Sequence, residues 1–222
     1  MSQEYTRDVT ILGQLPISGK VLFRNDFLHH IGFVESGTGG DTIFELDPSQ
    51  AFQGSQSLIT KTRTTGEAVD DQMNIILSTH LPPSKQVTIA HRFLSPSFDA
   101  HRFLQFDLSF YDGTNVHQGF IKYIHDTPQL TYVNSGGTET VITAFDHAFN
   151  TTPWHFFALS VDFANNLYKY AIIDEFLISL ANIPLYTPLN PGEVRMDTSI
   201  IYAADAAAAC QLSLDEVAIL EA

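Results

Sequence analysis

Cysteine is almost absent from this sequence of 222 residues, which contains only Cys210. A single cysteine excludes an intramolecular disulfide and a zinc site with four cysteine ligands. Basic residues are also scarce, with 11 Lys and Arg against 25 Asp and Glu, so the formal net charge is −14 at pH 7. Such a surface repels nucleic acid and anionic membranes, and no basic cluster offsets it. We therefore expect no nucleic-acid partner.

Long apolar runs are missing as well. No stretch of 18 apolar residues occurs, so we expect no membrane insertion. Residues 1–8 lack the apolar core of a secretory signal peptide. With no secretion signal visible, we expect a cytoplasmic protein or one that leaves the cell on a particle, such as a component of a virion surface.

Helical periodicity is absent, whereas alternation with a period of two is frequent. Between Arg102 and Tyr111, apolar residues occupy the even positions from Leu104 to Phe110, and mainly polar residues occupy the odd positions. This pattern predicts a half-buried strand. Asp112-Gly113 follows it and is typical of a tight turn between strands.

The same pattern recurs along the chain and predicts about 12 to 15 short strands. Among them are residues 86–94, 119–125, 130–134, 138–144, 156–163 and 168–172. The 44% hydrophobic content is enough for a sizeable core. We therefore expect an all-β, antiparallel β-sandwich over residues 21–222 as a single domain, preceded by an N-terminal arm over residues 1–20.

Three short motifs occur in a characteristic order. They are Leu22-Phe23-Arg24-Asn25-Asp26-Phe27, Ala51-Phe52-Gln53-Gly54-Ser55-Gln56-Ser57-Leu58, and Leu212-Ser213-Leu214-Asp215-Glu216-Val217-Ala218-Ile219-Leu220. This order resembles the concanavalin A-like and laminin-G-like jelly rolls and the β-sandwich carbohydrate-binding modules. Residues 154–162 and the following hairpin are similar to the penultimate strands of those proteins. The resemblance covers most of residues 21–222 and implies a jelly-roll fold.

The last of these motifs changes its parity. Leu212 and Leu214 share one face of a strand, whereas Val217 and Ile219 share the other. One extra residue reverses the facing of all the residues that follow it. The sequence therefore predicts a β-bulge at Asp215-Glu216.

The resemblance also implies a structural calcium ion, because related modules often carry one between an early acidic or amide side chain, the loop before the Gly-Ser strand and a terminal-strand Asp. The corresponding ligands here are Asn25 or Asp26, Gln53 or Ser55, and Asp215, of which we favour Asp26, Gln53 and Asp215. Calcium prefers such oxygen ligands. The alternative is that these are solvated polar residues at strand ends.

No catalytic motif is found in the sequence. Laminarinase-type relatives need Glu-x-Asp-x-x-Glu on one strand, and here the acidic pairs Asp174-Glu175 and Asp215-Glu216 are adjacent, so their side chains point to opposite faces. There is no Gly-x-Ser-x-Gly elbow and no His-Glu-x-x-His. The nine histidines show no metal-ligand spacing. We expect a protein that is not an enzyme.

Sugar-binding sites use exposed aromatic rings, with amides and carboxylates at the hydroxyl groups. The chain has 17 Phe, 8 Tyr and one Trp, a bias that favours core filling over a stacking platform. We expect Trp154 to pack in the core. The candidate ligand-binding residues are Tyr111, Tyr123 and Tyr132, which fall where a concave face or its rim is expected.

These features favour a non-enzymatic structural or attachment protein built on a jelly roll. A phage or viral virion-surface component, such as a decoration or tail protein with glycan recognition, needs no signal and no disulfides. Its arm, residues 1–20, would dock on a protein partner or on another copy of the chain. The alternatives are a stand-alone carbohydrate-binding module and, third, a glycoside hydrolase-like enzyme.

Overall fold

The structure of this protein is a computed structural model. It describes residues 20–25, 33–37, 42–52, 56–62, 72–80, 86–95, 101–144, 154–204 and 210–221. Within these ranges the chain forms 15 strands in two sheets, and every strand pair is antiparallel. The all-β antiparallel sandwich expected from the sequence is thus confirmed. Of the predicted arm, only Lys20 is described, and it is the first residue of a strand.

The first sheet, sheet A, has eight strands. Along its main path they are β13 (Phe176–Ser179), β12 (Leu167–Ile173), β11 (His155–Asp162), β6 (Gln86–Leu94), β15 (Gln211–Glu221), β4 (Ser57–Lys61) and β3 (Ile43–Asp47), and β1 (Lys20–Asn25) pairs with β15. β4 pairs with the first half of β15 and β1 with the second half.

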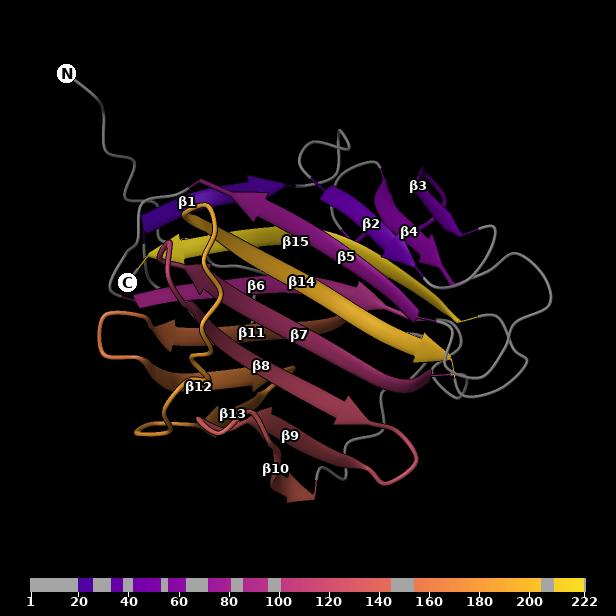
Figure 1. Ribbon diagram of the computed structural model, residues 1–222. Helices are drawn as coiled ribbons and strands as arrows, with labels where there is room; N and C mark the ends of the chain where they lie inside the picture. Colours follow the sequence, from indigo (N-terminus) through magenta and orange to yellow (C-terminus); the bar gives the residue numbers. More distant parts are fainter. Residues whose placement is uncertain are drawn as a thin grey trace.

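The second sheet, sheet B, has seven strands. In spatial order they are β10 (Glu139–Ala144), β9 (Gln129–Val133), β8 (Val116–Ile124), β7 (His101–Tyr111), β14 (Arg195–Ala204), β5 (Gln72–Thr79) and β2 (Phe33–Gly37). Figure 1 shows the two sheets as two layers, with β14 and β7 lying over β15 and β6. No helix in the described ranges has the length and hydropathy that a membrane crossing requires.

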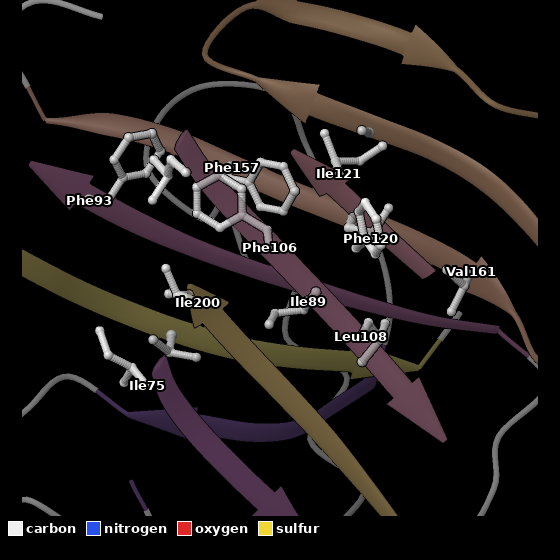
Figure 2. Close-up of a cluster of buried hydrophobic side chains, with 14 of the residues drawn as sticks. Ile75, Ile89, Phe93, Phe106, Leu108, Phe120, Ile121, Phe157, Val161 and Ile200 are labelled. Carbon is white, nitrogen blue, oxygen red and sulfur yellow. The ribbon is translucent and has the colours of Figure 1, made fainter. Parts of the chain in front are cut away.

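The core lies between the two sheets and is filled by the apolar residues that alternate along each strand. Phe106 of β7 stacks on Phe157 of β11, with ring centroids 3.9 Å apart, and Phe93 of β6 packs beside them at 5.3 Å from Phe106 (Figure 2). Ile89 and Ile200 belong to the same cluster. The sandwich is therefore held together by side chains that come from both sheets.

The predicted bulge in the terminal strand is confirmed. Asp215 of β15 lies opposite Arg92 of β6, whereas Ala218 lies opposite Ala90, so one extra residue is accommodated on β15. Glu216 has a φ of 50°, in the left-handed region that a bulge residue often adopts. The bulge keeps both halves of this strand directed into the core.

Candidate functional site

The two sheets differ in how accessible their outer faces are. On the outer face of sheet A, small and apolar side chains from its central strands are buried, among them Ala90, Phe156, Ala158 and Ala218. On the outer face of sheet B, several polar side chains remain half-buried. Because a ligand needs side chains that it can reach, the outer face of sheet B is the candidate site.

The register of sheet B places nine hydrogen-bonding side chains of β7, β8 and β14 on that outer face, beside the rings of Phe103 and Phe120. In the core-facing row of β7, Leu104, Phe106 and Leu108 are buried, so the odd-numbered residues point outward, together with their cross-strand neighbours on β8 and β14. We call this set the polar face. It consists of Gln105, Asp107, Ser109 and Tyr111 of β7, Gln118 and Lys122 of β8, and Arg195, Asp197 and Ser199 of β14.

Asp107 lies at the centre of the polar face, and its side chain is only 7% exposed. Its Oδ1 accepts a hydrogen bond from Gln105 Nε2 at 2.9 Å, and its Oδ2 accepts a longer one from Gln118 Nε2 at 3.4 Å. Burial raises the pKa of Asp107 to about 7, although these bonds and the charge of Lys122 oppose the rise. The carboxyl group therefore changes its charge near neutral pH.

The two cations of the polar face are each paired with a carboxylate. Lys122 Nζ lies 2.8 Å from Glu139 Oε1 on β10, and Arg195 Nε donates to Asp197 Oδ1 and Oδ2 at 3.2 and 3.0 Å. Asp197 raises the pKa of Arg195, which stays charged. Both pairs therefore use up much of the positive potential that the face offers to a ligand.

Tyr111 is the sequence-predicted ligand residue that the structure places on the polar face. It lies directly opposite Arg195, whose guanidinium carbon is 4.0 Å from the centre of the tyrosine ring. The ring is half-buried. A cation–π contact with Arg195 therefore covers one face of this ring, which lies beside hydrogen-bonding groups.

Tyr186 extends this face beyond β8. Its backbone pairs with Gln118 through two hydrogen bonds, at 2.9 and 3.2 Å, so its side chain points to the same side as Gln118. The ring packs against Gly137 in the β9–β10 turn, where an added Cβ would lie 2.8 Å from Tyr186 Cε2. Gly137 also has a φ of 78°, so glycine is needed there for both reasons.

Tyr123 and Tyr132 lie on the opposite side of sheet B. Tyr123 pairs with Leu104 and is 5% exposed within the core, and burial raises its pKa. Tyr132 pairs with Ile121 and packs edge-on against the buried Tyr168, with ring centroids 5.8 Å apart. The expectation that these two tyrosines lie on a concave face or its rim is therefore corrected, because both point to the core side of sheet B. Residues 119–124 are apolar at both parities except for Lys122, so the sequence pattern did not fix which way they point.

Of the three predicted calcium ligands, the structure describes Asp215. This carboxylate is fully buried at the bulge, and its oxygens accept hydrogen bonds from the backbone amides of Phe52 and Glu216, both at 2.8 Å. The loop before the Gly-Ser strand therefore reaches Asp215 through the backbone amide of Phe52. Asp26 and Gln53 lie outside the described residues, as does Ser55, and the side chain of Asn25 is not described either. Among the residues that are described, no three His, Cys, Asp or Glu side chains gather around a common metal position.

A serine and a histidine do approach each other elsewhere. Ser95 Oγ lies 2.8 Å from His101 Nε2, a pairing that resembles a nucleophile and its base. Both residues are buried, however, and Ser95 donates to the backbone oxygen of Gln211 at 2.7 Å. Burial lowers the pKa of His101 to about 4. This pair therefore has the surroundings of a structural contact within the sandwich.

Comparison with solved structures identifies the architecture. The cellulose-induced protein Cip1 matches 90% of this chain and 97% of its own length, with a TM-score of 0.57 and 11% sequence identity. The sandwich fold is shared. A carbohydrate esterase from the Shiga toxin-encoding bacteriophage phi24B matches 85% of this chain and 90% of its own, with a TM-score of 0.53 and 15% identity. A protein of unknown function from Shewanella oneidensis MR-1 matches 88% of this chain and 84% of its own, with a TM-score of 0.51 and 12% identity.

The β-sandwich fold that the resemblance implies is thereby confirmed. No family model matches the sequence, and no curated protein matches it. At these identities the comparisons show a common architecture, and the function has to be argued from the residues of this chain.

The sequence alone predicts which β7 residues of the polar face point away from the core. The odd positions of residues 102–111 were predicted to face away from the apolar row, and these supply Gln105, Asp107, Ser109 and Tyr111. The residues that β14 contributes were not predicted, because β14 is far from β7 in the sequence. The position of Tyr186 on this face could not be predicted either, because apolar and polar residues do not alternate in the segment that follows Pro184.

Proposed function

We propose that this protein is a non-catalytic glycan-recognition domain, and that its ligand binds on the polar face of sheet B. The observation that carries the proposal is the combination of aromatic rings with amide and carboxylate groups on one accessible sheet face. Tyr111 and Tyr186 offer rings for the apolar faces of sugars, and Gln105 and Gln118 offer amides for their hydroxyl groups.

The dimensions of the face suit an extended ligand. Four outward residues of β7 from Gln105 to Tyr111 span roughly 20 Å at the usual strand rise. Side chains from β8 and β14 flank this row on both sides. A chain of several sugar units would therefore contact more of the face than one sugar, and we expect affinity to increase with chain length.

The role of an attachment protein on a phage or viral particle would place such a domain where it meets cell-surface or matrix glycans. In that role the N-terminal arm would attach the domain to a protein partner on the particle. Residues 1–19 of this arm lie outside the described residues. Deletion of the arm tests this setting separately from glycan binding.

A glycan array tests the proposed activity. The purified chain should bind a defined subset of glycans, and isothermal titration with the best binder should show that Tyr111→Ala weakens binding about tenfold, the effect typical of losing a central aromatic contact. Leu177→Ala is the matched control, because Leu177 is 65% exposed on β13 of the other sheet. A chain that binds no glycan, or one whose binding survives both Tyr111→Ala and Gln118→Ala, would overturn the proposal.

A further inference from the structure

The direction of two amide groups on the polar face restricts the chemistry of the ligand. Gln105 and Gln118 both turn their Nε2 groups toward Asp107, because the carboxylate accepts hydrogen bonds from them. The carbonyl oxygens of these amides lie on the other side of each group, and no residue in the described ranges donates a hydrogen bond to them. Two hydrogen-bond acceptors are thus left for a ligand.

The charges on the polar face restrict the chemistry of the ligand further. Lys122 and Arg195 are the cations of the polar face, and each is held by a carboxylate at 3.0 Å or less. Asp107 has amide and hydroxyl partners but, within the described part of the chain, no salt bridge. When it is ionised, Asp107, Asp197 and the neighbouring Glu139 of β10 place three carboxylates against these two cations, on a chain whose formal net charge is −14.

We propose that the polar face selects neutral, hydroxyl-rich glycans and rejects glycans that carry carboxylate or sulfate groups, with Asp107 as the positioning residue that directs the amides of Gln105 and Gln118. A sugar hydroxyl donates a hydrogen bond to an amide oxygen, whereas a carboxylate or sulfate oxygen can only accept one. An anionic group would therefore meet acceptors without a donor, next to a carboxylate of the same sign. This inference rests on the proposed glycan-binding function and specifies its ligand class.

The experiment compares two kinds of immobilised oligosaccharide at pH 8, where Asp107 is ionised. Neutral oligomers of glucose, galactose, mannose and xylose form one set, and oligomers of galacturonate, glucuronate and sulfated galactose form the other. We expect binding to members of the neutral set that is at least about tenfold tighter than to any anionic oligomer.

Asp107→Asn tests the positioning role. An asparagine side chain both donates and accepts, so it no longer fixes the two glutamine amides, and the preference for neutral over anionic oligomers should shrink to about threefold or less. The control is Asp126→Asn, which makes the same charge change in the exposed turn between β8 and β9. It should leave the preference unchanged.

The outcomes separate the two proposals. Binding of anionic oligomers as tight as that of neutral ones would overturn the inference and leave glycan recognition intact. Binding of neither set would overturn the proposed function itself. A preference in the wild type that Asp107→Asn does not reduce would remove Asp107 from its positioning role. If Asp107→Asn does not fold, the double variant Gln105→Ala/Gln118→Ala is used, and it should weaken neutral binding without improving anionic binding.

Discussion

A buried histidine makes the stability of this sandwich depend on pH. The ring of His91 on β6 lies in the core with centroids 4.8 Å from Phe106 and 5.2 Å from Phe157, and neither ring nitrogen has a hydrogen-bond partner among the described residues. Burial lowers the pKa of His91 from 6.5 to about 3. The folded protein therefore holds the neutral ring at pH values where the unfolded chain binds a proton.

The sign and size of the effect follow from this shift. Between about pH 6.5 and pH 3 the unfolded state binds more protons, so stability falls as the pH falls. At pH 5.5 the loss attributable to His91 is about 1.4 kcal/mol, and this value hardly changes as long as the folded pKa stays well below 5. For a chain of this size it corresponds to roughly 3–6 °C in Tm.

The perturbation is His91→Phe, which removes the titrating group and keeps an aromatic ring in the cluster, with His91→Leu as a second variant if the larger ring does not fit. Urea unfolding followed by circular dichroism at pH 8 and pH 5.5 gives the free energy of unfolding at each pH. We expect the loss between the two pH values to be about 1.4 kcal/mol smaller in the variant than in the wild type. His80→Gln, at an exposed position, should leave the loss unchanged. An equal loss in wild type and variant would refute the reasoning.

Three further predictions concern packing, calcium and the arm. Gly119→Ala should destabilise the protein by about 1–3 kcal/mol in a thermal melt, because its Cβ would lie 3.0–3.1 Å from three buried side chains of the core, and an unchanged Tm would contradict this packing. If calcium binds at Asp215, a chelator should lower the Tm of the wild type but not that of Asp215→Asn, and a melt that ignores the chelator would eliminate the ion. Deletion of residues 1–19, which precede β1, should leave glycan binding intact and abolish assembly in sedimentation experiments; unchanged assembly would show that the arm does not dock.

Local pattern was enough to predict much of this fold. The alternation in residues 102–111 corresponds to β7, and the parity change after Leu214 corresponds to the bulge at Glu216. Both are effects of side-chain facing within one strand, which the sequence displays directly. The predicted strands over residues 130–134 and 138–144 likewise correspond to β9 and β10, which pair with each other.

The arrangement of the strands could not be predicted in the same way. β14 inserts between β7 and β5, and its pairing with both strands is fixed by packing across the sandwich and not by neighbouring residues. The polar face depends on that insertion, because Ser199 and Asp197 reach it only through β14. The facing of Tyr123 could not be predicted for a different reason, because its strand has apolar residues at both parities. Only the pairing with β7 shows that this side chain is buried.

NMR spectroscopy can locate the proposed glycan-binding surface on the polar face of sheet B. Backbone amide shifts of the labelled protein, recorded by NMR while the tightest neutral oligosaccharide from the array is added, test this proposal most directly. We expect saturable shifts that cluster on β7, β8 and β14, around Tyr111, Asp107 and Gln118. Shifts that cluster on sheet A instead, with sheet B unchanged, would contradict it.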